Sequence, residues 1–114
     1  MSQQAISLLA LSVTLAGTAA ANRFLTPAGA QAGADANTLG VSRSAGVAGE
    51  KITADVIGTA VVEAGAAVAA GATLKSDASG RAITWAVSGG KVAIALQPAA
   101  GAGSMIEVLL LPNA

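Results

Sequence analysis

Apolar and polar positions alternate over short stretches of this chain, and Gly, Asn, Asp and Pro residues separate the stretches. Alternation with a period of two is typical of strands, and turn signals between short strands are typical of an all-β domain. The pattern predicts strands at residues 12–15, 23–26, 39–42, 52–56, 59–63, 73–75, 82–86, 92–97 and 106–110. The sequence therefore predicts an all-β fold.

Alanine content favours a helix over residues 64–72, because alanine has the highest helix propensity. Gly65 and Gly71 enclose only five residues of that stretch. At most one short helical turn fits between them.

A chain of 114 residues is one domain by length, and no linker-like stretch divides it. We divide it into residues 1–20, an N-terminal arm or first strand, and residues 21–114, a single β-rich domain. The first segment is apolar and short of charge. An extended segment of this kind can add a strand to the sheet edge of a neighbouring chain, or it can be the first strand of its own domain.

The N-terminal segment also has features of a secretory signal, with an apolar run at residues 5–16 and small residues at 19–21. Its leader, residues 1–4, carries no Lys or Arg side chain, which a signal normally has. The apolar run is shorter than the roughly 20 residues that a membrane helix requires. We therefore expect a retained segment that does not cross a membrane.

About half of the apolar residues of the chain are alanine, and Phe24 and Trp85 are its two aromatic residues. Burial of an aromatic side chain removes roughly 150–250 Å² from water, far more than burial of an alanine. The core should therefore be thin, with Trp85 as its anchor. We expect contacts between chains or with a larger assembly to supply much of the stability.

Charge and residue content argue against several classes of function. Six basic and six acidic residues give a formal net charge of zero and form no basic face, so no nucleic-acid partner is expected. The chain has no Cys and no His, which removes thiol chemistry and the commonest general base and metal ligand. None of the carboxylates forms a spaced pair with a base. We expect no enzyme activity, no cofactor and no metal.

Residues 55–85 carry the most informative pattern. A strand containing G-x-A-x-V is followed by an Ala/Gly turn, a D-x-x-G hairpin and another strand. The residues of this pattern are Gly58, Ala60, Val62, Ala64, Gly65, Val68, Ala70, Gly71, Leu74, Asp77 and Gly80. This block resembles the central block of the capsid cement, or head decoration, proteins of tailed bacteriophages. Weaker likenesses in the same order at residues 22–30, 39–50, 92–96 and 106–110 extend the resemblance over nearly the whole chain.

The resemblance implies a small domain of the β-tulip or β-barrel kind that binds the outer surface of an assembled phage head. It implies a homotrimer that bridges major capsid protein subunits and stabilises the shell, in a virion whose parts are made in the host cytoplasm. The N-terminal segment is the best candidate for the contacts with the capsid or between subunits. Its candidate contact residues are Ile6, Leu8, Leu9, Leu11 and Val13.

Two other classes of function remain open from the residues alone. A secreted or surface-displayed β-domain, such as an adhesin-like module, would require the signal interpretation to be right. An ice-binding or carbohydrate-binding β-domain would have a similar Ala/Gly turn, but this chain lacks an obvious Thr array or aromatic platform.

Overall fold

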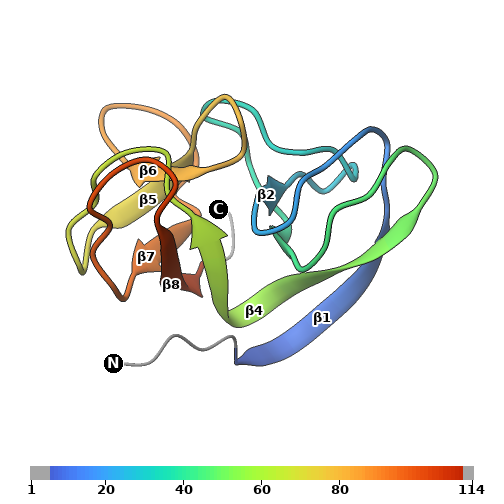
Figure 1. Ribbon diagram of the computed structural model, residues 1–114, viewed down its shortest axis with the longest axis horizontal. Coiled ribbons are helices and arrows are strands. Elements are labelled where there is room, and N and C mark those ends of the chain that lie inside the picture. The colour runs from blue at the N-terminus through green and yellow to red at the C-terminus, as the bar shows by residue number, and fades with distance from the viewer. Residues whose placement is uncertain (1–5, 112–114) are drawn as a thin grey trace.

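The computed structural model describes residues 6–111, and eight strands form its regular structure (Figure 1). The strands are β1 (Ser7–Thr14), β2 (Phe24–Leu25), β3 (Gly40–Ser42), β4 (Lys51–Glu63), β5 (Thr73–Ser76), β6 (Ala82–Thr84), β7 (Ala93–Ala95) and β8 (Met105–Leu110). No helix occurs among the described residues. The predicted all-β fold is confirmed.

The longest strand, β4, contains both of the strands predicted at residues 52–56 and 59–63. Gly58 lies between the two predicted strands and has a φ of 112°, a conformation that L side chains rarely adopt. A Cβ at this position would collide with the carbonyl oxygen of Ile6. Glycine therefore allows β4 to pair with β1 up to this point and with β8 beyond it.

The strands are hydrogen-bonded in the order β2-β3-β4-β8-β7-β5-β6, with β1 added to β4. The two ends of this order also approach each other. The Phe24 amide donates to the Gly80 carbonyl oxygen at 2.8 Å, which places β2 beside the turn between β5 and β6. A parallel bridge joins Ala64 to Ala82. The result is a nearly closed, barrel-shaped sheet, as the sequence predicts.

The residues at 64–72 make bridges instead of a helix. Ala64 pairs with Ala82, and Val68 pairs with Ala99 through two backbone hydrogen bonds of 3.0 and 2.9 Å. The helix propensity of alanine does not decide the structure of this segment, because its backbone groups form hydrogen bonds with other strands and loops of the barrel.

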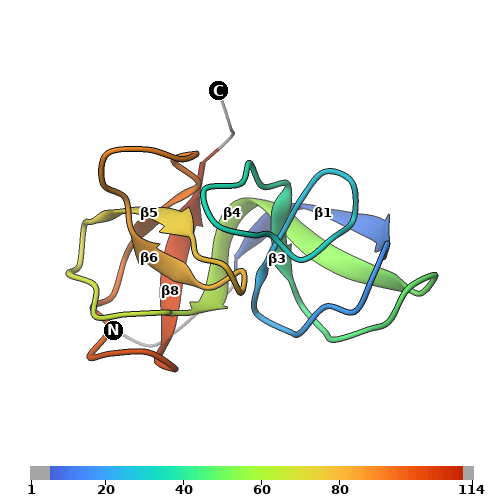
Figure 2. The ribbon, with the colours of Figure 1, turned by 90° about the horizontal axis from the view of Figure 1, so that it is seen from above.

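Two hydrophobic clusters lie along β4. Figure 2 shows this strand passing from the half of the molecule that contains β1 and β3 into the half that contains β5, β6 and β8. The smaller cluster packs Val13 and Leu15 against Ile52 and Ala54. The larger cluster lies inside the barrel and includes Phe24, which is fully buried.

The structure does not place Trp85 in the core, so the expectation that it is the core anchor is wrong for the single chain. Its side chain is half-buried, just beyond the end of β6. The indole N–H donates to the Gly89 carbonyl oxygen at 2.9 Å, and the Lys91 ammonium lies 4.5 Å from the ring centroid. At this position the indole N–H can donate a hydrogen bond and the ring can contact a cation. Phe24 has no polar atom that needs a hydrogen bond, so it can fill the core.

Candidate interaction surface

Strand β1 is an unusually exposed part of the sheet. Leu8 is 76% exposed, and Ile6, Leu9 and Leu11 are exposed as well. Within Ser7–Thr14, only Val13 is buried. An ordinary strand of a sheet with one wet face exposes only alternate residues, but here the side chains of 8–12 are exposed in succession. Both faces of this strand are therefore open in the single chain.

The candidate contact residues from the sequence divide into two groups. Ile6, Leu8, Leu9 and Leu11 are accessible on or just before β1. Val13 is 8% exposed and packs in the smaller cluster, so it is not accessible for a contact. Leu11, Val13 and Leu15 are spaced two residues apart because they lie on the inner face of the strand.

Backbone pairing holds β1 in place. It runs antiparallel to β4, with Leu11 opposite Ala54 and Thr14 opposite Lys51, and the register shifts on both sides of Leu9. Among residues 6–111, no second strand pairs with β1. Its sequence, SLLALSVT, contains no charge and no proline. Long apolar edges without such protection are templates for pairing with another chain.

A shallow groove begins beside β1 and continues away from it. One part, of about 220 Å³, lies between Leu11, Val13 and Pro27. A second part, of about 310 Å³, lies between Pro27, Leu39 and Ile57. Pro27 and Leu39 line both parts, so the two parts adjoin, and the second part is the more apolar of the two.

Charged side chains in the described part of the chain fasten elements together. Glu63 accepts from Arg23 at 3.2 Å and lies 3.6 Å from Arg81, which also lies 3.3 Å from Asp77. These contacts tie β4, the chain before β2, and the turn before β6 to one another. These ion pairs give the four side chains a structural role.

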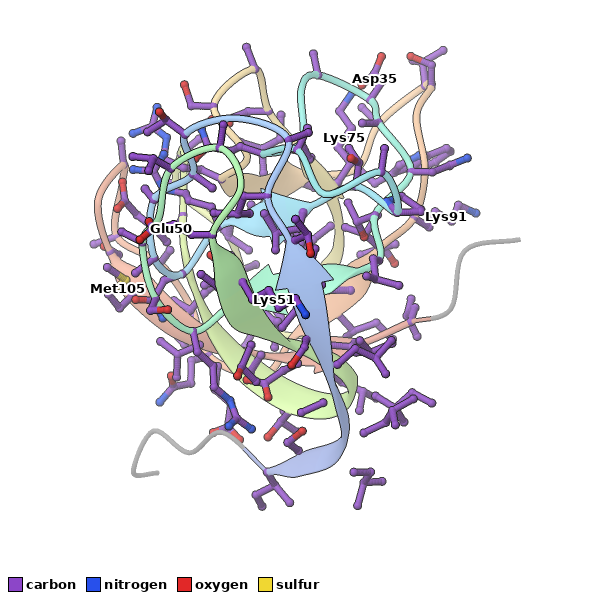
Figure 3. All side chains as sticks on the ribbon, turned by 90° about the vertical axis from the view of Figure 1, so that its right-hand side faces the viewer. Asp35, Glu50, Lys51, Lys75, Lys91 and Met105 are labelled. Atoms are coloured by element: carbon purple, nitrogen blue, oxygen red, sulfur yellow. The ribbon has the colours of Figure 1, made fainter. Side chains whose placement is uncertain are left out.

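Two further ion pairs hold loops against strands. Arg43 reaches Asp55 at 2.6 Å, and this carboxylate, by its hydrogen bond and its charge, raises the pKa of the guanidinium. Asp35 lies 2.7 Å from the Lys75 ammonium, and Figure 3 shows these two side chains together. The hydrogen bond from Lys75 is the main cause that lowers the pKa of Asp35, with smaller help from Ser88.

The described residues contain no group of three or more potential metal ligands among His, Cys, Asp and Glu. Within residues 6–111, no helix is long and apolar enough to span a membrane. The surface feature of this part of the chain that stands out is therefore the apolar β1 edge and its groove.

Fold and surface together define a small all-β structural protein with an apolar edge suited to association. The model of the phage cement protein family matches residues 4–110. This chain belongs to that family, which confirms the resemblance found in the sequence. The family match gives the chain a capsid-associated structural role.

The barrel also has a counterpart among solved structures. It is similar to the crystal structure of the head fiber gp8.5 N base of bacteriophage phi29, with a TM-score of 0.72 and 14% identity. The similarity covers 90% of this chain and 93% of the phi29 chain. At this identity the likeness shows the fold alone. The comparison with curated proteins gave no match.

Proposed function

We propose that this protein cements an assembled phage head by binding its outer surface and bridging major capsid protein subunits. Membership of the cement family supports the general role. The observation that carries the proposal is β1, an uncharged edge strand whose three leucines are exposed. It offers a partner main-chain hydrogen bonds along the edge and apolar side chains above and below it.

The contact would form by strand addition. An extended segment of the capsid protein pairs with the free edge of β1, and alternate side chains set the register. Leu8, Leu9 and Leu11 are exposed in the single chain, so their side chains can make apolar contacts with the added strand. The zero net charge of the chain allows many copies to coat one shell without mutual repulsion.

Stabilisation of the shell then follows from mass action. A ligand that binds only the assembled head favours that state by RT ln(1 + [L]/Kd). We propose that the protein acts as a homotrimer, because three linked β1 edges touch several capsid subunits and add avidity. In this proposal the trimer is made in the host cytoplasm and ends on the outer capsid surface of the virion.

Sedimentation with purified heads that lack the protein tests the proposal. The protein should cosediment with assembled, expanded heads and should not bind unassembled capsid subunits. Equal binding to free subunits, or no binding to heads, would contradict the proposed function.

A matched pair of variants tests the role of β1. Leu8→Lys places a charge on the most exposed leucine of β1, and we expect it to weaken head binding at least about tenfold, which corresponds to about 1.4 kcal/mol. Val87→Lys places the same charge at a side chain that is 96% exposed and lies outside the strands. Head binding by the Val87 variant should equal that of the wild type, and equal losses in both variants would show that β1 is not the contact.

A further inference from the structure

The backbone groups of β1 alternate between the two edges of the strand. The Leu15 amide donates to the Glu50 carbonyl oxygen at 2.8 Å, so the backbone of Leu15 points toward β4. In an antiparallel pair, every second residue directs its N–H and C=O groups at the neighbouring strand. The backbone groups of Ala10, Ser12 and Thr14 therefore point away from β4, to the rim of the sheet (Figure 1). Within residues 6–111, no strand pairs with this rim.

The turn at residues 26–30 closes the far end of the rim. The Ala16 amide donates to the Gly29 carbonyl oxygen at 3.0 Å. Gly29 has a φ of 91°, and a Cβ there would collide with the Thr14 carbonyl oxygen. The backbone at Gly29 thus already lies where a strand added to β1 would continue. It occupies the space beside Thr14, and this leaves Ala10 and Ser12 as the open positions.

The smaller part of the groove, of about 220 Å³, lies beside the open rim, and we call it the β1 hollow. Residues 11–14 line it together with Pro27, Ala28, Gly29 and Leu39. Side chains of consecutive strand residues point to opposite faces, so a hollow that touches all four residues of β1 borders its edge. Leu11 lies on the inner face of the strand and is nevertheless 39% exposed. The inner side of β1 is therefore uncovered where the hollow begins.

We propose that the β1 hollow binds one apolar side chain of the capsid segment that pairs with Ala10 and Ser12. This inference rests on the proposed function and deepens it, because it names the position that a side chain of the capsid protein occupies. Opposite residues in antiparallel pairs share a face. The capsid residue opposite Leu11 therefore points to the inner side and enters the hollow against Pro27 and Leu39.

The chemistry of the rim and the hollow defines this partner. Outward N–H and C=O groups at every second residue are matched by an extended backbone, which presents its own groups at the same spacing. Leu11, Pro27 and Leu39 offer no charge to a side chain in the hollow. A charged side chain would lose hydration there without a partner. The segment is therefore an extended one with an apolar residue between two residues that face the opposite side.

A second copy of β1 fits this rim less well than a capsid segment does. In an antiparallel pair of two β1 strands centred on Leu11, Thr14 of one copy lies opposite Leu8 of the other. The turn at 26–30 lies on the paired edge beside Thr14. This turn of each copy would therefore meet the start of β1 in the other copy. A segment without such a turn avoids the collision.

A proline at the rim tests the backbone pairing. Ser12→Pro removes the outward N–H, and proline is tolerated at an edge where this N–H faces solvent. We expect it to weaken binding to heads that lack the protein at least about tenfold, because a carbonyl oxygen of the added segment loses its donor. Ser12→Ala is the matched control, because it keeps the N–H, and it should bind as the wild type does. Cosedimentation measures binding, and circular dichroism checks the fold.

A larger side chain in the hollow tests the apolar site and decides if Ser12→Pro fails to fold. Ala28 is exposed and lines the hollow. Ala28→Leu fills the space that the capsid side chain would take, and we expect head binding to weaken about tenfold. Ala67→Leu makes the same change at an exposed alanine outside the groove, and it should bind heads as the wild type does.

The outcomes separate this inference from the proposed function. If the wild type binds heads and the folded Ser12→Pro and Ala28→Leu variants bind equally well, the inference is wrong and the proposed function stands. Loss of binding in Ser12→Pro alone also overturns it, since the hollow then holds no capsid side chain. A wild type that binds no heads overturns the proposed function and this inference together. If sedimentation equilibrium without heads shows that Ser12→Pro dissociates a wild-type oligomer, a second copy occupies the rim and the inference is wrong.

Discussion

The two halves of β4 lie in different environments. Beyond Gly58, Ala60 and Val62 are fully buried in a cluster of 16 buried residues inside the barrel. Before Gly58, Ile52 and Ala54 belong to a cluster of six, covered on one side by the exposed strand β1. One continuous strand thus joins a well-packed half to a thinly packed half.

This difference teaches how a small, alanine-rich chain can combine stability with an open edge. Regions with few buried apolar contacts open locally at a lower free-energy cost than the packed core. The barrel half can hold the fold, while the β1 half keeps its edge available to a partner. Arg23, by its 3.2 Å contact with Glu63, ties the start of β2 to the end of β4 in the packed half.

The largest effect on stability should come from the aromatic residue of the packed half. Phe24→Ala empties a fully buried site, and we expect it to lower the free energy of unfolding by about 3–5 kcal/mol. Trp85→Ala removes a half-buried side chain and one cation–π contact, so it should cost only about 1 kcal/mol. Urea unfolding of both variants measures the difference, and a reversed ranking would mean that Trp85 is buried in the native assembly.

A second pair of substitutions compares the two halves with the same chemistry. Leu74→Ala lies in the large cluster and Leu15→Ala in the small one, and both side chains are buried. We expect both substitutions to lower the free energy of unfolding by about 2–5 kcal/mol. The loss should be near the upper end of this range for Leu74→Ala and near the lower end for Leu15→Ala, because fewer neighbours surround the cavity at Leu15. Equal losses in urea unfolding would show that the halves are equally well packed.

Deletion of residues 1–10 should lower the free energy of unfolding less than the core substitutions do, and it should weaken head binding more. The described residues that it removes are exposed or half-buried, while Val13 and Leu15 stay in the small cluster. We expect a folded β-rich domain by circular dichroism and a loss of head binding by sedimentation. Unfolding of the shortened chain would identify this segment as an essential core strand.

The smallest effect concerns the ion pair between Asp35 and Lys75. The pKa of Asp35 is lowered in the folded state, so the pair stabilises the fold above the ordinary carboxyl pKa. This contribution is lost as the pH falls through the lowered value. Lys75→Gln should raise the pKa of Asp35 in an NMR titration, since the main cause of the shift is removed. Lys91→Gln is the control, because Lys91 packs on Trp85, and an equal shift in this variant would contradict the assignment.

Much of the fold could be predicted from local pattern. Each predicted strand coincides with an observed strand or overlaps it, because alternation and turn residues act over a few positions. The sequence did not predict that residues 52–56 and 59–63 form one continuous strand, β4. Glycine at position 58 is typical of a strand break, and only the structure shows that Ile6 lies against it. The role of Trp85 was missed because side-chain size alone does not say which aromatic residue the barrel encloses.

The candidate contacts followed from the sequence only in part. An apolar, uncharged N-terminal segment was visible, and Ile6, Leu8, Leu9 and Leu11 are indeed accessible on it. The burial of Val13 was not visible, because it depends on Ile52 and Ala54, which lie about 40 residues away in the chain. The exposure of Leu109 was equally hidden, since alternation gives two faces without saying which one is inside.

The sequence by itself determined the all-β class, the positions of most strands and the family, since these depend on residue types and spacing along the chain. The tertiary structure decided which face of each strand is buried, which aromatic residue fills the core and which strand keeps a free edge. These properties depend on contacts between residues far apart in the chain, and the same local alternation is compatible with either face turned inward.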